Sequence, residues 1–138
     1  MKQRVVSLSD FGPAENMSLI EADIPTPGSG QIVVKNNAIG LNYLDTYFRS
    51  GLYPWPNNND IKIPGSEGVG YIHAVGSDVP DFKEGDKVSY VTPVGAYAEY
   101  AIINAAHAAK INVEVEDFRK WSLNGIRIIT GNFRWVPE

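Results

Sequence analysis

Pro25-Thr-Pro-Gly-Ser-Gly30 leads directly into Gln31-Ile-Val-Val-Lys35, and this change from turn residues to a compact β-branched run decides the fold class. Proline and glycine favour turns, whereas isoleucine and valine pack well on a pleated strand. Further strands are expected at residues 69–75, 87–91 and 95–103, each bounded by glycine or a tight turn. Many short strands with such turns are typical of a small barrel or sandwich and not of βαβ units.

Length and composition limit the possible functions. The chain has 138 residues, of which 43% are hydrophobic and 20% charged, and this suits one globular domain. Its net charge of −4 gives no excess of basic residues for binding nucleic acid. It contains no cysteine, so disulfides, thiolate nucleophiles and cysteine-built zinc sites are excluded. No signal-peptide core or apolar run of membrane-spanning length is present, so we expect a cytoplasmic protein without a membrane partner.

One helix interrupts the strand pattern. Asn42-Tyr-Leu-Asp45 can form a capping box, and Gly51 supplies the left-handed stop, so a helix is expected between them, with Leu44, Tyr47 and Phe48 on one face. A second helix is expected at about residues 114–123. Residues 126–130 and 133–136 are predicted to pair as a hairpin around Gly131-Asn132.

Generic chemical motifs are absent. Gly68-Val-Gly70 begins like a dinucleotide-binding loop, but His73 occupies the third glycine position and the segment opens a strand instead of a helix. His73 and His107 are the only histidines and have no cysteine to join them, so neither is expected to bind a metal. No serine lies in a nucleophile elbow, which leaves a hydrolase unsupported.

Several ordered blocks are more specific. They are Ala38-Ile-Gly-Leu-Asn-Tyr-Leu-Asp-Thr-Tyr47, Arg49-Ser-Gly-Leu-Tyr-Pro54, Pro64-Gly-Ser-Glu-Gly-Val-Gly70 with Val75-Gly76, Phe82-Lys-Glu-Gly-Asp-Lys-Val88 and Gly95-Ala-Tyr-Ala-Glu-Tyr100. From about residue 3 to about residue 112 the chain resembles the quinone oxidoreductases of the medium-chain dehydrogenase/reductase superfamily. The resemblance implies a mainly β fold, a GroES-like partly open barrel with short helices, at residues 1–112. It leaves residues 113–138 as a linker helix and an atypical tail.

Two departures point to the zinc-independent branch. Zinc-dependent alcohol dehydrogenases carry a cysteine where this chain has Asn42 and a histidine where it has Ser66. The cysteine-rich lobe of those enzymes has no counterpart between Val91 and Gly95. The resemblance therefore implies a protein without zinc.

The resemblance also implies hydride transfer from NADPH to a quinone or related carbonyl. In the family the stretch that matches residues 42–47 lines the cleft beside the nicotinamide and its ribose. This assigns Asn42 and Tyr47 as catalytic, Tyr53 to the substrate, and a cofactor-binding set of Tyr43, Leu44, Asp45, Thr46 and Tyr47. Helix capping can also explain Asn42 and Asp45 completely, and packing can explain Tyr47. Glu67 is interpreted as a structural partner and not as a catalytic residue.

The Rossmann domain of the family has no counterpart in this sequence. One hypothesis is the substrate-side domain of an oxidoreductase, inactive alone and completed by a Rossmann domain supplied in cis by a longer gene or in trans as a separately encoded chain. A homodimer is a further possible assembly. The alternative is a non-catalytic barrel that acts as a binding or structural module.

Overall fold

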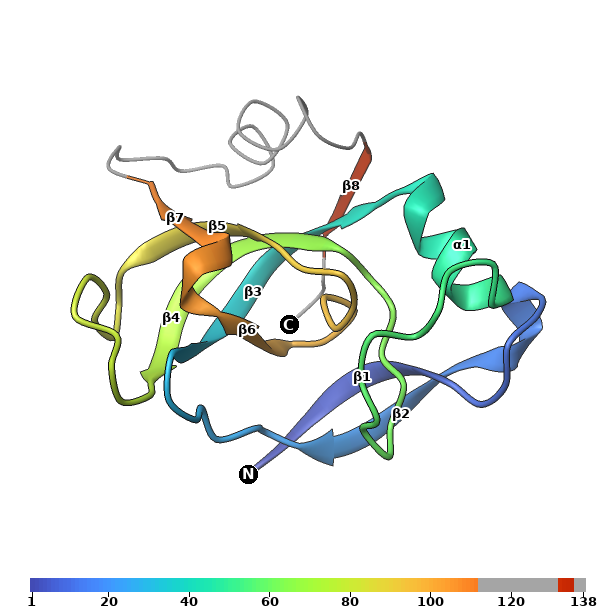
Figure 1. Cartoon of the computed structure of the whole chain (residues 1–138), viewed down its shortest axis with the longest axis horizontal. Coiled ribbons are helices and arrows are strands. Elements are labelled where there is room, and N and C mark those ends of the chain that lie inside the picture. The colour runs from blue at the N-terminus through green and yellow to red at the C-terminus, as the bar shows by residue number, and fades with distance from the viewer. Residues whose placement is uncertain (112–131, 136–138) are drawn as a thin grey trace.

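The computed structural model describes residues 1–111 and the backbone of residues 132–135. Its elements follow one another as β1 (Lys2–Leu8), η1 (Ala14–Asn16), β2 (Met17–Asp23), β3 (Gln31–Leu41), α1 (Tyr43–Ser50), β4 (Glu67–Val75), β5 (Lys87–Val91), β6 (Tyr100–Asn104), η2 (Ala105–His107), β7 (Ala108–Lys110) and β8 (Asn132–Trp135). The sheets form a curved body with the β1–β2 hairpin below it and α1 at one end (Figure 1). The strands expected after the turn at residues 25–30 and at residues 69–75 and 87–91 are present.

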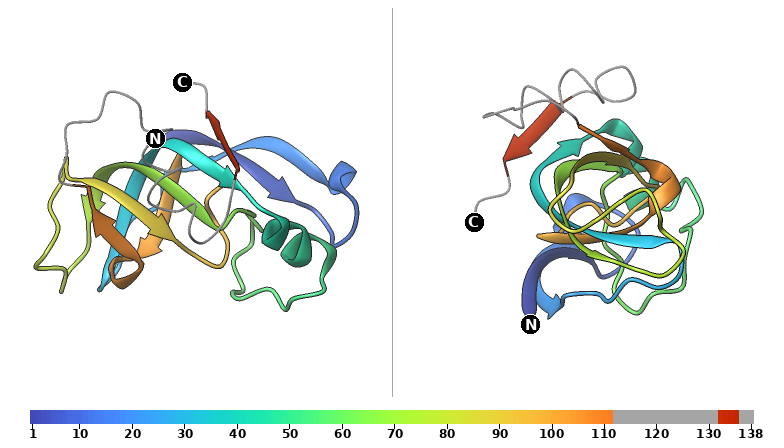
Figure 2. Two further views of the ribbon diagram at one scale, coloured as in Figure 1. Left: turned by 90° about the horizontal axis from the view of Figure 1, so that it is seen from above. Right: turned by 90° about the vertical axis from the view of Figure 1, so that its left-hand side faces the viewer.

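The larger sheet curls into a partly open barrel. Its strand order is β6-β3-β4-β5-β7, with β8 also pairing β3. The two ends of this order, β6 and β7, are separated along the chain only by η2, so the sheet must bend until its edges approach (Figure 2). The amide of Val6 in β1 donates to the Tyr97 carbonyl at 2.9 Å, which attaches the hairpin to the barrel. The predicted GroES-like barrel is confirmed.

The strand expected at residues 95–103 is only partly correct, because β6 begins at Tyr100. Gly95 has a φ of +108°, which interrupts an extended strand. The amides of Ala96 and Tyr97 donate to the carbonyls of Gly65 and Pro64 at 3.1 and 2.9 Å, instead of joining a strand ladder. This segment therefore packs across the barrel as an irregular loop before β6.

The core lies inside the barrel. Its buried side chains come from β3, β4, β5, β6 and the loop before β6, and they are Ile32, Val34, Ile72, Val88, Tyr90, Ala96, Ala101 and Ile103. Val33 is also completely buried, so both faces of β3 are covered at its start. This explains the continuous β-branched run there, since a half-exposed strand would alternate apolar and polar residues.

A buried polar pair lies within this core. The Tyr90 hydroxyl donates to Asn36 Oδ1 at 2.8 Å, and Asn36 Nδ2 donates to the carbonyls of Ala96 and Ala98 at 3.3 and 2.9 Å. Burial raises the pKa of Tyr90 well above its usual value, so the phenol remains a donor. Asn36 thereby joins β3 to β5 and to the loop before β6.

Replacing Tyr90 by phenylalanine is expected to lower the free energy of unfolding by about 1–3 kcal/mol, because Asn36 Oδ1 would remain buried without its donor. Urea denaturation followed by circular dichroism measures this change. Tyr43→Phe is the matched control, since Tyr43 is 85% exposed and its substitution should alter stability by at most about 0.5 kcal/mol. Equal midpoints for the two variants would contradict the assigned role of the Asn36–Tyr90 pair.

Two predictions near the C-terminus fall wholly or partly outside the described residues. The helix expected at 114–123 and the first strand of the hairpin expected at 126–136 lie there. The second strand is present as β8, which pairs antiparallel with β3 and places Ala38 opposite Trp135. None of the helices in the described part of the chain has the length and apolar character needed to cross a bilayer.

Candidate functional site

The site predicted from the sequence is arranged around the start of α1. Asn42 follows β3 directly and adopts an extended backbone, as an N-cap residue does. Asp45 Oδ2 accepts from the Asn42 backbone amide at 3.1 Å, and the Asn42 side chain approaches the Asp45 backbone, which gives the predicted capping box. Gly51 ends the helix with a φ of +82°, a conformation that glycine adopts without strain.

Asp45 ties the helix to the barrel. Its side chain is 5% exposed, and Oδ1 accepts from the Ser66 hydroxyl at 2.7 Å while Oδ2 accepts from the Tyr97 hydroxyl at 2.6 Å. A carboxylate that accepts several hydrogen bonds can remain in the interior, since these donors replace the lost hydration. Asp45 therefore joins α1 to the segment before β4 and to the loop before β6.

Glu67, the first residue of β4, is a second buried carboxyl group at this position. It is completely buried, and its Oε1 accepts from Asn42 Nδ2 at 3.1 Å. Desolvation raises the pKa of Glu67 to about 7; the negative charge of Asp45 adds to the rise, and the Asn42 hydrogen bond opposes it. Gly40 faces this carboxyl, and a β-carbon at that position would overlap Glu67. The absence of a side chain at Gly40 therefore leaves room for the carboxyl beside Asn42.

Exposed aromatic rings lie on the outer side of α1 and on the loop after it. Tyr43, Tyr47 and Tyr53 are 85%, 40% and 43% exposed. The rings of Tyr47 and Tyr53 lie with centroids 5.4 Å apart, and Phe48 meets Tyr53 edge-on at 5.6 Å. Trp55 extends the same group by contacting Phe48. Two phenol hydroxyls are thus presented beside an apolar wall, which can hold a planar ring and donate hydrogen bonds to its oxygen atoms.

The structure separates the predicted residues into two groups. Tyr43, Tyr47 and Tyr53 are accessible to a ligand, whereas the polar atoms of Asn42 and Asp45 face the protein interior. Asn42 Oδ1 is buried and makes no hydrogen bond to any described residue. Of the other predicted cofactor contacts, Leu44 and Thr46 are half-buried, and the Thr46 hydroxyl donates to the Tyr43 carbonyl at 2.6 Å.

Glu67 was predicted only as a structural partner, and its hydrogen bond from Asn42 agrees with that role, whereas Phe48 and Trp55 were not among the predicted site residues. The signal for Glu67 was a charged residue that opens an otherwise apolar strand next to Ser66. The signal for the two rings was weaker, since Phe48 was predicted only to share a helix face with Leu44 and Tyr47, and Trp55 belongs to no predicted element. Among residues 1–111, no group of three or more histidine, cysteine, aspartate or glutamate side chains could hold a metal ion.

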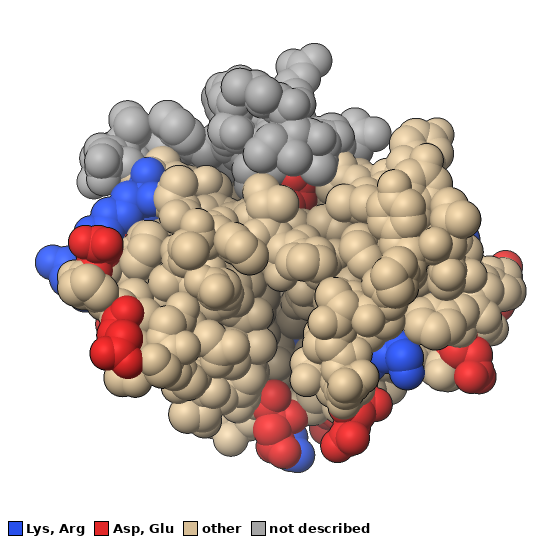
Figure 3. Space-filling view, in the orientation of Figure 1, with Lys and Arg blue, Asp and Glu red and all other residues tan. Residues whose placement is uncertain are grey.

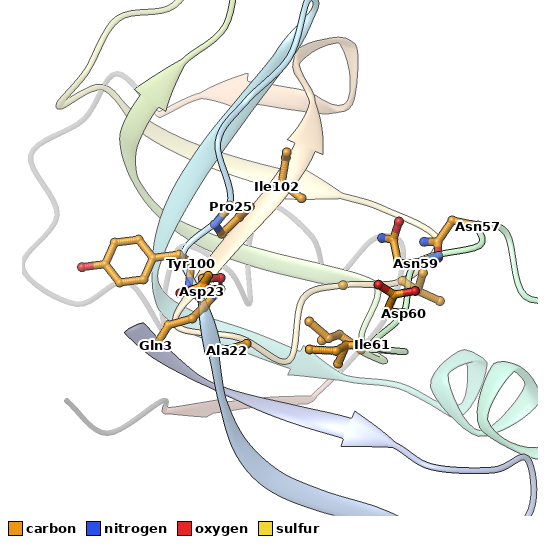
Figure 4. A pocket seen from close by; sticks show the side chains of 13 residues that line it. Gln3, Ala22, Asp23, Pro25, Asn57, Asn59, Asp60, Ile61, Tyr100 and Ile102 are labelled. Carbon is orange, nitrogen blue, oxygen red and sulfur yellow. Dashed lines mark hydrogen bonds between the residues drawn. The ribbon is translucent and has the colours of Figure 1, made fainter. Parts of the chain in front are cut away.

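A separate groove of about 360 Å³ lies between the β1–β2 hairpin, β6 and the loop at residues 57–63 (Figure 4). Its polar lining includes Gln3, Asp23, Asn57, Asn59 and Asp60, and none of the predicted site residues lines it. Gln3 is occupied within the protein, because its Oε1 accepts from the Tyr100 amide at 2.8 Å. The groove is therefore distinct from the surface on α1.

Charged side chains are unevenly distributed on the face shown in Figure 3. They lie mainly at the end opposite α1 and along the lower edge, and the centre of this face is largely uncharged. The uncharged region extends over much of the end that carries α1. This distribution suits the recognition of an uncharged planar molecule better than that of a polyanion.

Known proteins resemble this chain in sequence and in fold. A family model described as "Alcohol dehydrogenase GroES-like domain" matches residues 28–113. A probable quinone oxidoreductase of Schizosaccharomyces pombe is 41% identical over 116 residues, which cover 83% of this chain and 34% of that protein. The chain thus spans about a third of the length of this curated relative.

Solved structures agree in fold. The quinone oxidoreductase of Pseudomonas syringae pv. tomato DC3000 matches with a TM-score of 0.81 and 39% identity, covering 93% of this chain and 39% of that one. The Escherichia coli quinone oxidoreductase complexed with NADPH matches with a TM-score of 0.67 and 33% identity, covering 80% of this chain and 33% of that one. The matched residues and the shared fold show that the chain belongs to the alcohol dehydrogenase GroES-like domain family, with quinone oxidoreductases of the medium-chain dehydrogenase/reductase superfamily among its relatives.

Proposed function

We propose that this chain is the substrate-side domain of a zinc-independent, NADPH-dependent quinone reductase. The observation that carries the proposal is the pair of exposed phenols, Tyr47 on α1 and Tyr53 on the loop after it, whose rings lie 5.4 Å apart. Asp45 anchors α1 to the barrel through its hydrogen bonds with Ser66 and Tyr97. Relatives of this chain are quinone oxidoreductases, and one of them has been solved with NADPH. A rigid scaffold under an accessible aromatic surface is what a site needs to orient a planar substrate.

The residues at α1 fit the nicotinamide end of NADPH in part. Tyr43 and Tyr47 present exposed rings that can pack against a flat heterocycle. Asp45 does not fit a direct contact, because both carboxylate oxygens are engaged by protein donors, and we assign it to holding the helix. NADPH, when bound, supplies the hydride.

The protein's own contribution is orientation and hydrogen bonding. Reduction of a quinone to a hydroquinone adds a hydride and a proton, and the negative charge that develops on a quinone oxygen requires a donor. Tyr47 can donate its phenol hydrogen to that oxygen, while Tyr53 and Phe48 pack against the ring and exclude water. Asn42 is held close to this surface by Glu67 and sets the start of the helix that carries Tyr47.

We expect the isolated chain to oxidise NADPH with duroquinone no faster than the uncatalysed reaction. Hydride transfer needs donor and acceptor held about 3–3.5 Å apart, and the sequence contains no recognisable loop to bind a pyrophosphate. Loss of NADPH absorbance measures the rate, with and without a separately expressed nucleotide-binding domain of a relative. Saturable turnover by the chain alone would contradict this expectation.

Binding of the quinone tests the site independently of turnover. Titration of the ¹⁵N-labelled chain with duroquinone should shift the amide signals of residues 43–53, and Tyr47→Phe should weaken the effect. Tyr100→Phe is the matched control, since Tyr100 lines the separate groove. Shifts confined to that groove would contradict the assigned site, and the absence of any shift would favour the non-catalytic barrel.

A further inference from the structure

We propose that Glu67 is a positioning residue of the candidate site, whose proton determines which end of the Asn42 amide faces it. The inference deepens the proposed function, since Asn42 gains a role in catalysis only if the surface on α1 is the site. The hydrogen-bonding change itself does not depend on NADPH or a quinone and can be measured in their absence.

The ionised state of Glu67 matches the observed contacts. An ionised carboxylate only accepts hydrogen bonds, and Asn42 Nδ2 donates to Glu67 Oε1 at 3.1 Å. This orientation directs Asn42 Oδ1 away from Glu67 and towards the Asp45 backbone, as the capping box requires. The Asn42 amide therefore satisfies Glu67 with one end and turns the other, which makes no hydrogen bond to a described residue, towards the first turn of α1.

The protonated state has a different requirement. A carboxylic acid has an O–H group that must find an acceptor when it is buried, because an unsatisfied buried donor is costly. Asn42 Oδ1 is a buried acceptor without a hydrogen-bond partner among the described residues, and it belongs to the side chain that already contacts Glu67. A half-turn of the amide brings Oδ1 to the Glu67 proton and places Nδ2 near the Asp45 backbone, where a donor cannot cap the helix.

Neighbouring titratable groups influence the protonation of Glu67, and through it the orientation of the Asn42 amide. Asp45, on α1, places a second carboxyl group near Glu67 and disfavours its ionised form. Tyr90, on β5, also interacts with Glu67, and burial keeps its phenol protonated. Tyr97, in the loop before β6, lies one contact further away and donates to Asp45. Desolvation of Glu67, and to a smaller extent the charge of Asp45, raise the pKa of Glu67 to about 7 against the opposing Asn42 hydrogen bond, so both states are populated near neutral pH.

Nuclear magnetic resonance of the full chain between pH 5 and 9 tests the proposal. The Glu67 carboxyl ¹³C signal and the Asn42 side-chain ¹⁵N signal should change with one common midpoint near pH 7. Above this pH the backbone amides in the first turn of α1 should exchange their hydrogens with solvent more slowly, after correction for the intrinsic exchange rate. Glu67→Gln should abolish the Asn42 titration, whereas Glu84→Gln, at an exposed turn, should leave it unchanged. An Asn42 signal that stays constant while Glu67 titrates would overturn the proposal.

A second variant keeps the test valid if Glu67→Gln does not fold. Asn42→Ser retains an N-cap residue but has no second amide end to turn towards Glu67, so the pH dependence of first-turn amide exchange in α1 should disappear. First-turn exchange that keeps its pH dependence in this variant would overturn the proposal. Loss of quinone binding with normal Glu67 and Asn42 titrations would instead count against the proposed function alone.

Discussion

Replacement of Gly70 by alanine is expected to lower the free energy of unfolding by about 3 kcal/mol, the largest loss that we predict for a single added methyl group. Gly70 lies in β4 opposite Asn36 of β3, next to an irregularity in the register of the two strands. A β-carbon there would overlap the carbonyl oxygen of Lys35. That oxygen belongs to the backbone of β3, which is paired with both β4 and β6 and cannot move aside without disturbing these pairings.

Gly28→Ala is the matched control for this prediction. A β-carbon at Gly28 would meet the end of the Gln31 side chain at 3.1 Å, and a flexible side chain can move aside. We expect a change within about 0.5 kcal/mol. Urea denaturation of both variants measures the difference, and similar midpoints would show that the β3–β4 pair can open to admit a side chain.

The second large effect concerns stability and pH. The folded state raises the pKa of Glu67 from 4.5 to about 7, so folded Glu67 binds a proton that the unfolded chain has already lost over this range. Stability therefore falls as the pH rises from 4.5 to 7 and is constant above that range with respect to this group. The full contribution is on the order of 3 kcal/mol, since each unit of pKa difference corresponds to about 1.4 kcal/mol.

Glu67→Gln removes this contribution while keeping a carbonyl acceptor for Asn42. Relative to the wild-type chain, the variant should gain stability steadily between pH 5 and 7.5. Asp23, Asp86 and Glu99 have lowered pKa values, and they affect both proteins equally at lower pH. Thermal denaturation at half-unit pH intervals measures the difference. A constant difference between the two proteins over this range would show that Glu67 ionises in the folded state as it does in water.

The candidate site lowers the free energy of unfolding at one junction of the fold. Two buried carboxyl groups, Asp45 and Glu67, lie at the junction of α1 with β4, and desolvation makes the ionisation of Glu67 unfavourable relative to water. Burial without full compensation is commonest where a side chain serves a site and not the core. This junction supports the helix that carries Tyr47. The same few residues therefore affect both the stability of the chain and its proposed activity.

Local sequence was sufficient for α1 and for three of the expected strands. The helix begins after Asn42, ends at Gly51 and is capped by Asp45. These features depend on residues within one or two helical turns of each other, so a short stretch of sequence is enough to predict them. The β-branched run at 32–34 and its turns likewise marked β3. The ordered motifs then identified the GroES-like barrel, because their residue types and order are specific even though each motif is short.

The sequence by itself thus determined the fold class, the capped helix and the family, since these depend on neighbours along the chain. Only the tertiary structure decided that Asn42 turns inward to Glu67, that Asp45 binds Ser66 and Tyr97, and that the strand expected at 95–103 starts at residue 100. These contacts join residues 21 to 52 positions apart. They depend on how closely separate strands approach, as at Gly40, and periodicity within one segment carries no information about that distance.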